Sequence, residues 1–250
     1  MSDGQSRPAR DELFTIDTVE EDFDFNERVV EVFDDMLYRS VPCYNEVIGG
    51  AARLLESYLH STDTVYDLGC STGTTLLEMS RLLADKGLRF VGIDSSGPML
   101  EKARLKAELY RKQDTLRFDQ GDITTMRFAP ESGAFILNYT LQFIRPLQRE
   151  SFLRRLYSAL RPGGIVLLSE KVISHDRRLN RKFIDIYHQF KRARGYSELE
   201  IAKKREALEN VLVPFSITEN QAMLRQVGFT PVETYLQWFN FASFVAVKPS

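Results

Sequence analysis

Small and acidic residues at the ends of two predicted strands could bind a nucleoside. Residues 65–73 form a hydrophobic strand that breaks into a turn of small side chains before a helical pattern begins. Gly69 and Gly73 let the backbone turn tightly and approach a ligand, because no Cβ stands in the way. Asp94 ends the next predicted strand, where a carboxylate can accept hydrogen bonds from both ribose hydroxyls of an adenosine. Ser71 stands where a second glycine is usual, so the turn alone has little specificity.

Two further strand ends and one helix start supply the other candidate contacts. Asp122 could accept a hydrogen bond from an adenine amino group, and Ile123 could pack against the ring; a turn-forming or helix-capping aspartate is the alternative. Asn138 ends the fourth predicted strand. Tyr44 follows the break at Pro42, at the entrance of a helix, where its ring could cover a ligand; a buried packing tyrosine is the alternative.

Strands and helices alternate along most of the chain. Hydrophobic runs predict strands at residues 64–67, 89–94, 116–122, 134–137 and 165–169, and apolar residues at helical spacing fill the intervals. This alternation implies right-handed parallel crossovers and a doubly wound α/β sheet, with ligands outside the carboxyl ends of the strands. A helix at 147–160 should end at the RPGG sequence. A helix at 219–227 and a hairpin of strands 232–240 and 243–247 should complete the fold.

The N-terminal part of the chain and one later segment depart from this alternation of strands and helices. Residues 1–24 are acidic and are expected to form a flexible leader, either a solvated tail or a lid that orders on ligand binding. Residues 25–250 are expected to form a single domain that begins with two helices. The charged, helix-rich residues 177–212 predict a helical insertion after the fifth strand, forming a lid, a dimer surface or both.

The composition disfavours several classes of protein. A formal net charge of −2 provides no general field for a phosphate backbone, so we expect no direct contact with nucleic acid. Cys43 and Cys70 do not have the spacing of metal ligands, and the three histidines are scattered, so we expect no metal and no disulfide. Neither a secretory signal nor a run long enough to span a membrane is evident, which favours a cytoplasmic protein without membrane contact.

Three short segments point to one superfamily. DLGCSTG, GIDSS and LRPGG occur in the order typical of class I methyltransferases that depend on S-adenosylmethionine (SAM), and the chain resembles them. The resemblance implies a Rossmann-like class I methyltransferase fold, with a seven-stranded, mostly parallel sheet and an antiparallel C-terminal strand. Asp122 and the terminal aromatic hairpin favour SAM over a dinucleotide as the ligand.

A closer resemblance covers nearly the whole chain. The segments that support it are FNERVVEVFDDM, SVPCY, LNYTLQF, LSEK, FKRARGYSELEIAKKREALENVL and WFNFASFVAVK. They lie outside the general methyltransferase motifs and are similar to the carboxy-SAM synthase family. Membership implies conversion of SAM and prephenate to carboxy-SAM and phenylpyruvate, in which a sulfonium ylide captures carbon dioxide released from prephenate. Carboxy-SAM is the donor for carboxymethylation of the tRNA wobble uridine, and the family analogy also implies a homodimer.

The same resemblance implies which residues form the site. Arg205 would be the catalytic arginine, since a planar guanidinium offers two parallel hydrogen bonds to the new carboxylate; spacing alone would not distinguish it from its basic neighbours. His188 and Tyr196 could face prephenate, with core or dimer packing as the alternative. No conventional general base stands out. SAM contacts are implied for Tyr44, Gly69, Cys70, Ser71, Asp94, Ser95, Asp122, Ile123, Asn138 and Arg205.

Two other functions stay open on the sequence alone. The same pocket would serve a conventional SAM-dependent methyltransferase of small molecules. It would also serve a catalytically silent SAM-binding protein whose bound ligand stabilises a partner surface. The sequence leaves open which residues contact prephenate and whether the insertion reaches a neighbouring subunit's site.

Overall fold

The computed structural model describes residue 11, residues 27–209 and residues 211–250. The leader predicted at residues 1–24 therefore lies outside the described residues, with the exception of Asp11. Whether that leader is a tail or a lid stays a prediction.

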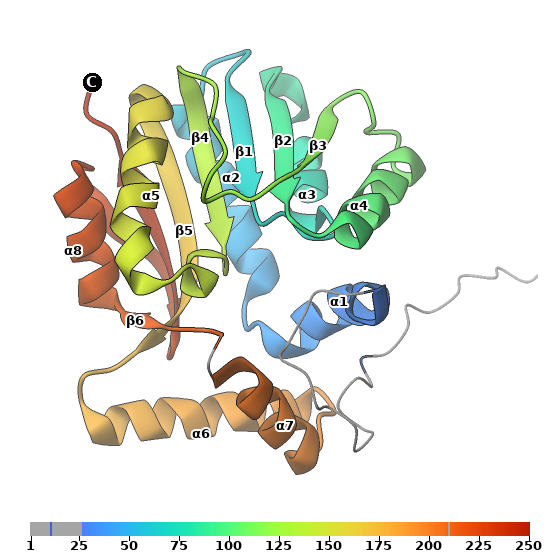
Figure 1. Cartoon of the computed structure of the whole chain (residues 1–250), viewed down its shortest axis with the longest axis vertical. Coiled ribbons are helices and arrows are strands. Elements are labelled where there is room, and N and C mark those ends of the chain that lie inside the picture. Colours follow the sequence, from blue (N-terminus) through green and yellow to red (C-terminus); the bar gives the residue numbers. More distant parts are fainter. Residues whose placement is uncertain (1–10, 12–26, 210) are drawn as a thin grey trace, which may run out of the picture.

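A twisted sheet forms the centre of the molecule (Figure 1). Its strands follow the order β3-β2-β1-β4-β5-β8-β7, and the short strand β6 pairs with β5 outside this path. Only β8 runs antiparallel to the others, because it pairs in antiparallel fashion with both β5 and β7. The predicted seven-stranded, mostly parallel class I methyltransferase sheet is thus confirmed, with β6 as an addition. The bounds are β1 Thr64–Leu68, β2 Arg89–Asp94, β3 Leu116–Gln120, β4 Ser132–Asn138, β5 Leu160–Ile173, β6 Phe215–Ser216, β7 Val232–Trp238 and β8 Phe241–Val247.

Helices cover both faces of the sheet because its strands are apolar on both sides. In β4, for example, Ile136 joins one buried cluster and Phe135 the other. The first cluster is shared with α2, α3 and α4, and the second with α5 and α8. This two-sided burial is typical of a parallel sheet built from crossover units. The bounds are α2 Tyr44–Tyr58, α3 Thr74–Leu82, α4 Gly97–Leu109, α5 Pro146–Ala159 and α8 Ile217–Val227, with 3₁₀ turns η1 Ala84–Lys86 and η2 Leu141–Phe143.

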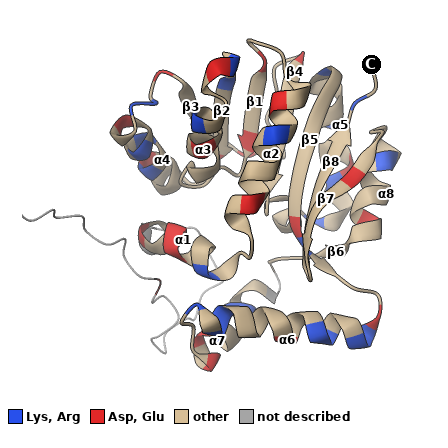
Figure 2. Ribbon diagram, turned by 180° about the vertical axis from the view of Figure 1, so that it is seen from behind, with Lys and Arg blue, Asp and Glu red and all other residues tan. Residues whose placement is uncertain are grey.

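Three helices lie beyond the carboxyl ends of the central strands β1 and β4 (Figures 1 and 2). They are α1 Glu27–Ser40, α6 Arg177–Ala193 and α7 Glu198–Glu209, the last two within the predicted insertion. The Tyr187 hydroxyl of α6 donates to the Ser40 carbonyl at 2.9 Å, and Arg39 Nε donates to the Arg194 carbonyl at 2.9 Å. These bonds tie the insertion to α1. Its function as a lid or a dimer surface stays a prediction.

The fifth strand begins earlier than predicted. β5 starts at Leu160, so residues 161–164, expected to end the preceding helix, lie inside the strand. Leu160 pairs with Ser132, and a register shift separates this pair from the regular ladder. Gly163, at φ +70°, donates its N–H to the Lys248 carbonyl at 2.9 Å. Tertiary backbone bonds therefore extend an irregular strand through a sequence that locally favours a turn.

The third strand is shorter than predicted, since β3 ends at Gln120 and leaves Asp122 in the following loop.

Within the described ranges no helix is both long and apolar enough to cross a membrane. The same residues contain no group of three or more His, Cys, Asp or Glu arranged to hold a metal ion.

Candidate functional site

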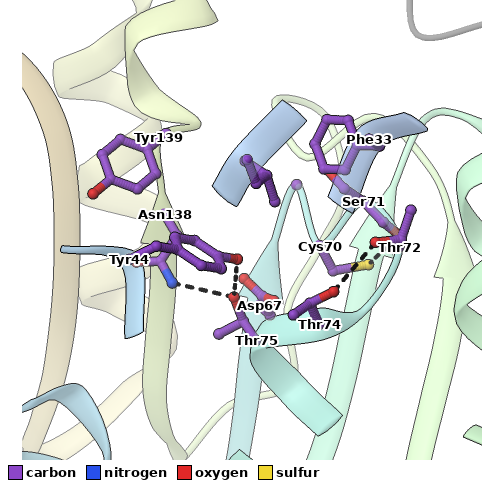
Figure 3. Close-up of a pocket in the computed structure, with 12 residues that line it drawn as sticks. Phe33, Tyr44, Asp67, Cys70, Ser71, Thr72, Thr74, Thr75, Asn138 and Tyr139 are labelled. Carbon is purple, nitrogen blue, oxygen red and sulfur yellow. Dashed lines mark hydrogen bonds between the residues drawn. The ribbon is translucent and has the colours of Figure 1, made fainter. Parts of the chain in front are cut away.

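Two hollows that share part of their lining lie beyond the carboxyl ends of β1, β2 and β4. The smaller is lined by the β1 turn, Tyr44, Thr75 and Asn138 (Figure 3). The larger has a volume of about 740 Å³ and extends from the β1 turn to α6 and α7. Such volumes suit a ligand of cofactor size together with a second small molecule.

The β1 turn brings backbone groups to the cavity wall in conformations that favour glycine. Gly69 has φ +77°, and a Cβ built there would lie 2.7 Å from the Thr140 side chain. The N–H groups of Gly69 and Cys70 donate to the Ile93 carbonyl at 2.8 and 3.0 Å, which fixes the turn against β2. Ser71 has φ +48°, a left-handed backbone conformation that is uncommon for residues other than glycine. Ser71 is also the position where the usual pattern has a second glycine.

Asp94 is held at the carboxyl end of β2 by backbone donors. Its Oδ2 accepts from Ser71 N–H and its Oδ1 from Ser96 N–H, both at 2.9 Å. Burial nevertheless raises the pKa of the carboxyl group. A carboxylate has about four acceptor positions, so Asp94 can also accept from two ribose hydroxyls. The turn and the carboxylate therefore hold one another in place, and the contact of Asp94 with a ribose stays a prediction.

The loop after β3 holds Asp122 in a local turn. Its Oδ1 accepts from the N–H and the hydroxyl of Thr124 at 2.8 and 2.6 Å, the pattern of a turn-forming aspartate. Asp122 therefore has the turn-forming role that was the alternative, and its contact with an adenine stays a prediction. Both Asp122 and Ile123 line the larger cavity, and Ile123 packs on the apolar cluster beneath α5.

Two buried acceptors at the cavity wall have no hydrogen-bond partner among the described residues. They are Asp67 Oδ2 and Asn138 Oδ1. The Asn138 amide instead donates from Nδ2 to Thr75 Oγ1 at 3.3 Å, and that hydroxyl also contacts the Tyr44 hydroxyl at 3.2 Å (Figure 3). Orphaned buried acceptors require a donor, and the α-ammonium group of SAM is a suitable one. The residues of the site therefore fit SAM: Asp94 suits its ribose, and Asp67 with Asn138 suits its amino group.

Helix α1 is fastened to the β1 turn by a cluster that the sequence did not reveal. Asp34 Oδ1 accepts from the hydroxyls of Thr72 and Thr74 at 2.7 and 3.0 Å, and Asp34 Oδ2 lies 2.6 Å from Lys106 Nζ. Lys106 and these bonds lower the pKa of Asp34 despite its burial. The sequence offers one indication of this cluster, because Asp34 is a polar residue beside the apolar face of α1. The spacing of residues does not identify the partners of Asp34.

Strand β5 and the helical insertion contribute cationic groups to the opposite wall. Lys171 from β5, His188 and Lys191 from α6, and Arg205 from α7 all line the larger cavity. The two lysines were not among the residues predicted from the sequence. Tyr196 does not line either cavity; its buried hydroxyl donates to the Asp11 carboxylate and accepts from Ser40 at 3.2 Å, so it has the packing role kept as the alternative.

All ten residues implied as SAM contacts line one of the two cavities, although they come from six separate segments of the chain. Their contacts with the ligand stay predictions. The residues are Tyr44, Gly69, Cys70, Ser71, Asp94, Ser95, Asp122, Ile123, Asn138 and Arg205.

Substitution of Asp67 should change how stability depends on pH. Burial, and then the charge of Asp94, raise the pKa of Asp67 to about 8. The unfolded carboxyl titrates near pH 4, so between about pH 4 and pH 8 the folded chain binds one more proton, and stability falls as pH rises. Asp67→Asn should flatten this slope in urea unfolding of the ligand-free protein. Asp114→Asn, at an exposed carboxylate, should keep it; equal slopes in wild type and Asp67→Asn would contradict the assignment.

Comparison with known proteins identifies the family. Residues 65–164 match the family described as "Methyltransferase domain". A carboxy-S-adenosyl-L-methionine synthase from Desulfotalea psychrophila is 63% identical over 240 residues, covering 96% of this chain and 98% of that protein. One from Wolinella succinogenes is 48% identical, with the same coverage of both chains.

A solved structure agrees with the fold. Human N-acetylserotonin methyltransferase in complex with SAM has a TM-score of 0.64 at 18% identity, covering 90% of this chain and 57% of that chain. This chain thus spans little more than half of that enzyme, and the likeness concerns the fold alone. The identity to the two synthases, in contrast, extends over the site and the helical insertion, so the chain belongs to the carboxy-S-adenosyl-L-methionine synthase family.

Proposed function

We propose that this protein converts SAM and prephenate into carboxy-SAM and phenylpyruvate. The observation that supports the proposal most strongly is that one continuous cavity is lined both by Asp94 and by Arg205 with other cationic groups. A conventional methyl acceptor site does not require this concentration of positive charge. An anionic second substrate and an added carboxylate do.

The proposed reaction balances without an external reagent. The SAM methyl group, acidified by the adjacent sulfonium, loses a proton to give an ylide. Prephenate loses its ring carboxylate as carbon dioxide and its ring hydroxyl, which leaves with that proton as water, and the ring becomes aromatic. The ylide carbon forms a bond to carbon dioxide. One SAM and one prephenate thus give one carboxy-SAM, one phenylpyruvate and one water.

The protein's task in this reaction is to orient the substrates and to exclude water. An ylide and free carbon dioxide would both be lost to bulk solvent, so they must form within a closed site. Apolar side chains from α1 and the η2 turn, among them Phe33, Leu37 and Phe143, line the cavity around the β1 turn. Arg205 then binds the carboxylate as it forms, through two parallel charge-assisted hydrogen bonds.

The wider setting is part of the same proposal. Carboxy-SAM made here would supply the donor for carboxymethylation of the tRNA wobble uridine by another enzyme. The net charge of −2 supports a protein that does not itself bind the tRNA. We further propose that it acts as a cytoplasmic homodimer.

A product assay tests the proposal. Full-length protein incubated with SAM and prephenate, without a methyl acceptor, should yield carboxy-SAM and phenylpyruvate in equal amounts by chromatography and mass spectrometry. Phenylpyruvate supplied in place of prephenate is the control, and it should yield no carboxy-SAM because it lacks the ring carboxylate. Folded protein that binds SAM but leaves it unchanged with prephenate would refute the synthase reading.

A further inference from the structure

Two lysines in the larger cavity have no acidic partner among the described residues. Lys171 projects from β5 and Lys191 from α6, and neither ammonium group has a hydrogen bond or an ion pair to any described residue. Their nitrogen atoms lie 5.3 and 4.9 Å from the centroid of the same ring, that of Tyr187. Lys191 is only 6% exposed. Buried ammonium groups without a counter-ion are costly, so their position requires a reason.

The nearby Lys204, in contrast, has the polar partners expected of a lysine that stabilises the fold. Its Nζ lies 3.5 Å from Asp11 Oδ2 and donates to Ser40 Oγ at 3.0 Å. The Asp11 carboxylate is thus shared by Lys204 and the Tyr196 hydroxyl, while Arg39 Nη1 donates to the main-chain carbonyl of Asp11 at 2.9 Å. This carboxylate stabilises the packing of α7 on α1, and its effect on Lys191 is weaker than the opposing effects of burial, Lys204 and Lys171.

The electrostatics of the wall favour an incoming anion. Burial, and then the charges of Lys204 and Lys171, lower the pKa of Lys191 to about 7, against a weaker opposing effect of Asp11. Burial alone lowers the pKa of Lys171. The pKa of His188 is lowered by burial and then by Lys191 and Lys171. A carboxylate placed among these groups would relieve their mutual repulsion.

The rest of this end of the cavity suits a carbocyclic ring. Ile184, Ile201, Leu208 and Phe241 line it beside the two lysines. An apolar surface next to uncompensated positive charge is complementary to a ring that bears a carboxylate.

We infer that Lys171 and Lys191 bind the carboxylate that the second substrate keeps, separately from the carboxylate that is transferred to SAM. This inference rests on the proposed function. Prephenate has a ring carboxylate, which is lost, and a pyruvyl carboxylate, which phenylpyruvate retains. Anchoring the retained group on the lysines orients the ring so that the departing carboxylate faces SAM and Arg205. The two carboxylates thus have separate cationic sites.

Neutral substitutions of the two lysines test the inference. Lys171→Met and Lys191→Met should each raise the KM for prephenate by roughly 10- to 100-fold, the loss expected for a hydrogen bond between charged groups. The dissociation constant of phenylpyruvate, measured by equilibrium titration, should rise by a similar factor, and that of SAM should stay unchanged. Lys182→Met is the matched control, because it removes the same charge from an exposed position of α6.

Thermal melting separates a binding role from a structural one. Methionine fills a similar volume without a charge, so Lys191→Met should melt at the same or a higher temperature than wild type. Lys191→Arg, which keeps the charge, should retain part of the prephenate affinity. An unchanged KM in both methionine variants would overturn the inference, as would a raised KM accompanied by an equal loss of SAM affinity and a lower melting temperature.

The two proposals fail in different ways. If wild-type protein makes no carboxy-SAM, the proposed function is wrong, and the titration with phenylpyruvate still decides whether the lysines bind a carboxylate. If wild type makes carboxy-SAM and the methionine variants do so with the wild-type KM, only the lysine site is wrong.

Discussion

Replacing Arg205 by alanine should remove most carboxy-SAM formation and retention, while SAM binding stays largely intact. The guanidinium lines the larger cavity from α7, where the added carboxylate is its expected partner. Loss of two charge-assisted hydrogen bonds should weaken carboxy-SAM by about 100-fold or more, whereas SAM lacks the group concerned. Titration calorimetry with both ligands, together with the product assay, measures the difference.

Two variants serve as controls for Arg205. Arg205→Lys should recover only part of the carboxy-SAM affinity, since an ammonium group cannot form the paired geometry of a guanidinium. Arg178→Ala removes an exposed arginine of α6 and should have no effect. Equal losses of SAM and carboxy-SAM affinity in Arg205→Ala would mean that Arg205 supports the fold of the site and does not recognise the added carboxylate.

Asp94→Ala should weaken SAM and carboxy-SAM alike. The substitution removes the expected acceptor of the ribose hydroxyls and also the partner of Ser71 and Ser96 N–H, so the β1 turn loses a support. We expect a cost of roughly 1 to 3 kcal/mol, or about 5- to 150-fold in both dissociation constants. Asp114→Ala, at an exposed aspartate, is the control. An unchanged SAM affinity in Asp94→Ala would refute the ribose role.

The SAM side of the site was largely predictable from the sequence because its residues follow strand ends. In a parallel sheet, adjacent strands end at one edge, so Asp94 and Asn138 could be placed near the β1 turn from hydrophobic runs alone. The strand pairings bear out this reasoning, with β1 between β2 and β4. A hydrophobic run does not fix side-chain direction at the end of a strand, so the sequence predicts no ligand contact for Asp67, one residue before the end of β1.

The opposite wall could not be predicted from local pattern. Asp11 contacts Lys204 across 193 positions of sequence, and Asp34 contacts Thr72 across 38, so no local periodicity relates the partners. Lys171 lies in a strand directly after Ser169 and Glu170, and Lys191 lies in a helix rich in charged residues. Neither context distinguishes a lysine facing a cavity from one in solvent. Only the family resemblance identified Arg205, and nothing identified the two lysines.

The fate of one carbon atom tests the proposed reaction most directly. Prephenate labelled isotopically in its ring carboxylate should be incubated with unlabelled SAM and full-length protein, and both products analysed by mass spectrometry. Carboxy-SAM should contain the label, and phenylpyruvate should not. Unlabelled carboxy-SAM, or a labelled phenylpyruvate beside unchanged SAM, would contradict the proposed reaction.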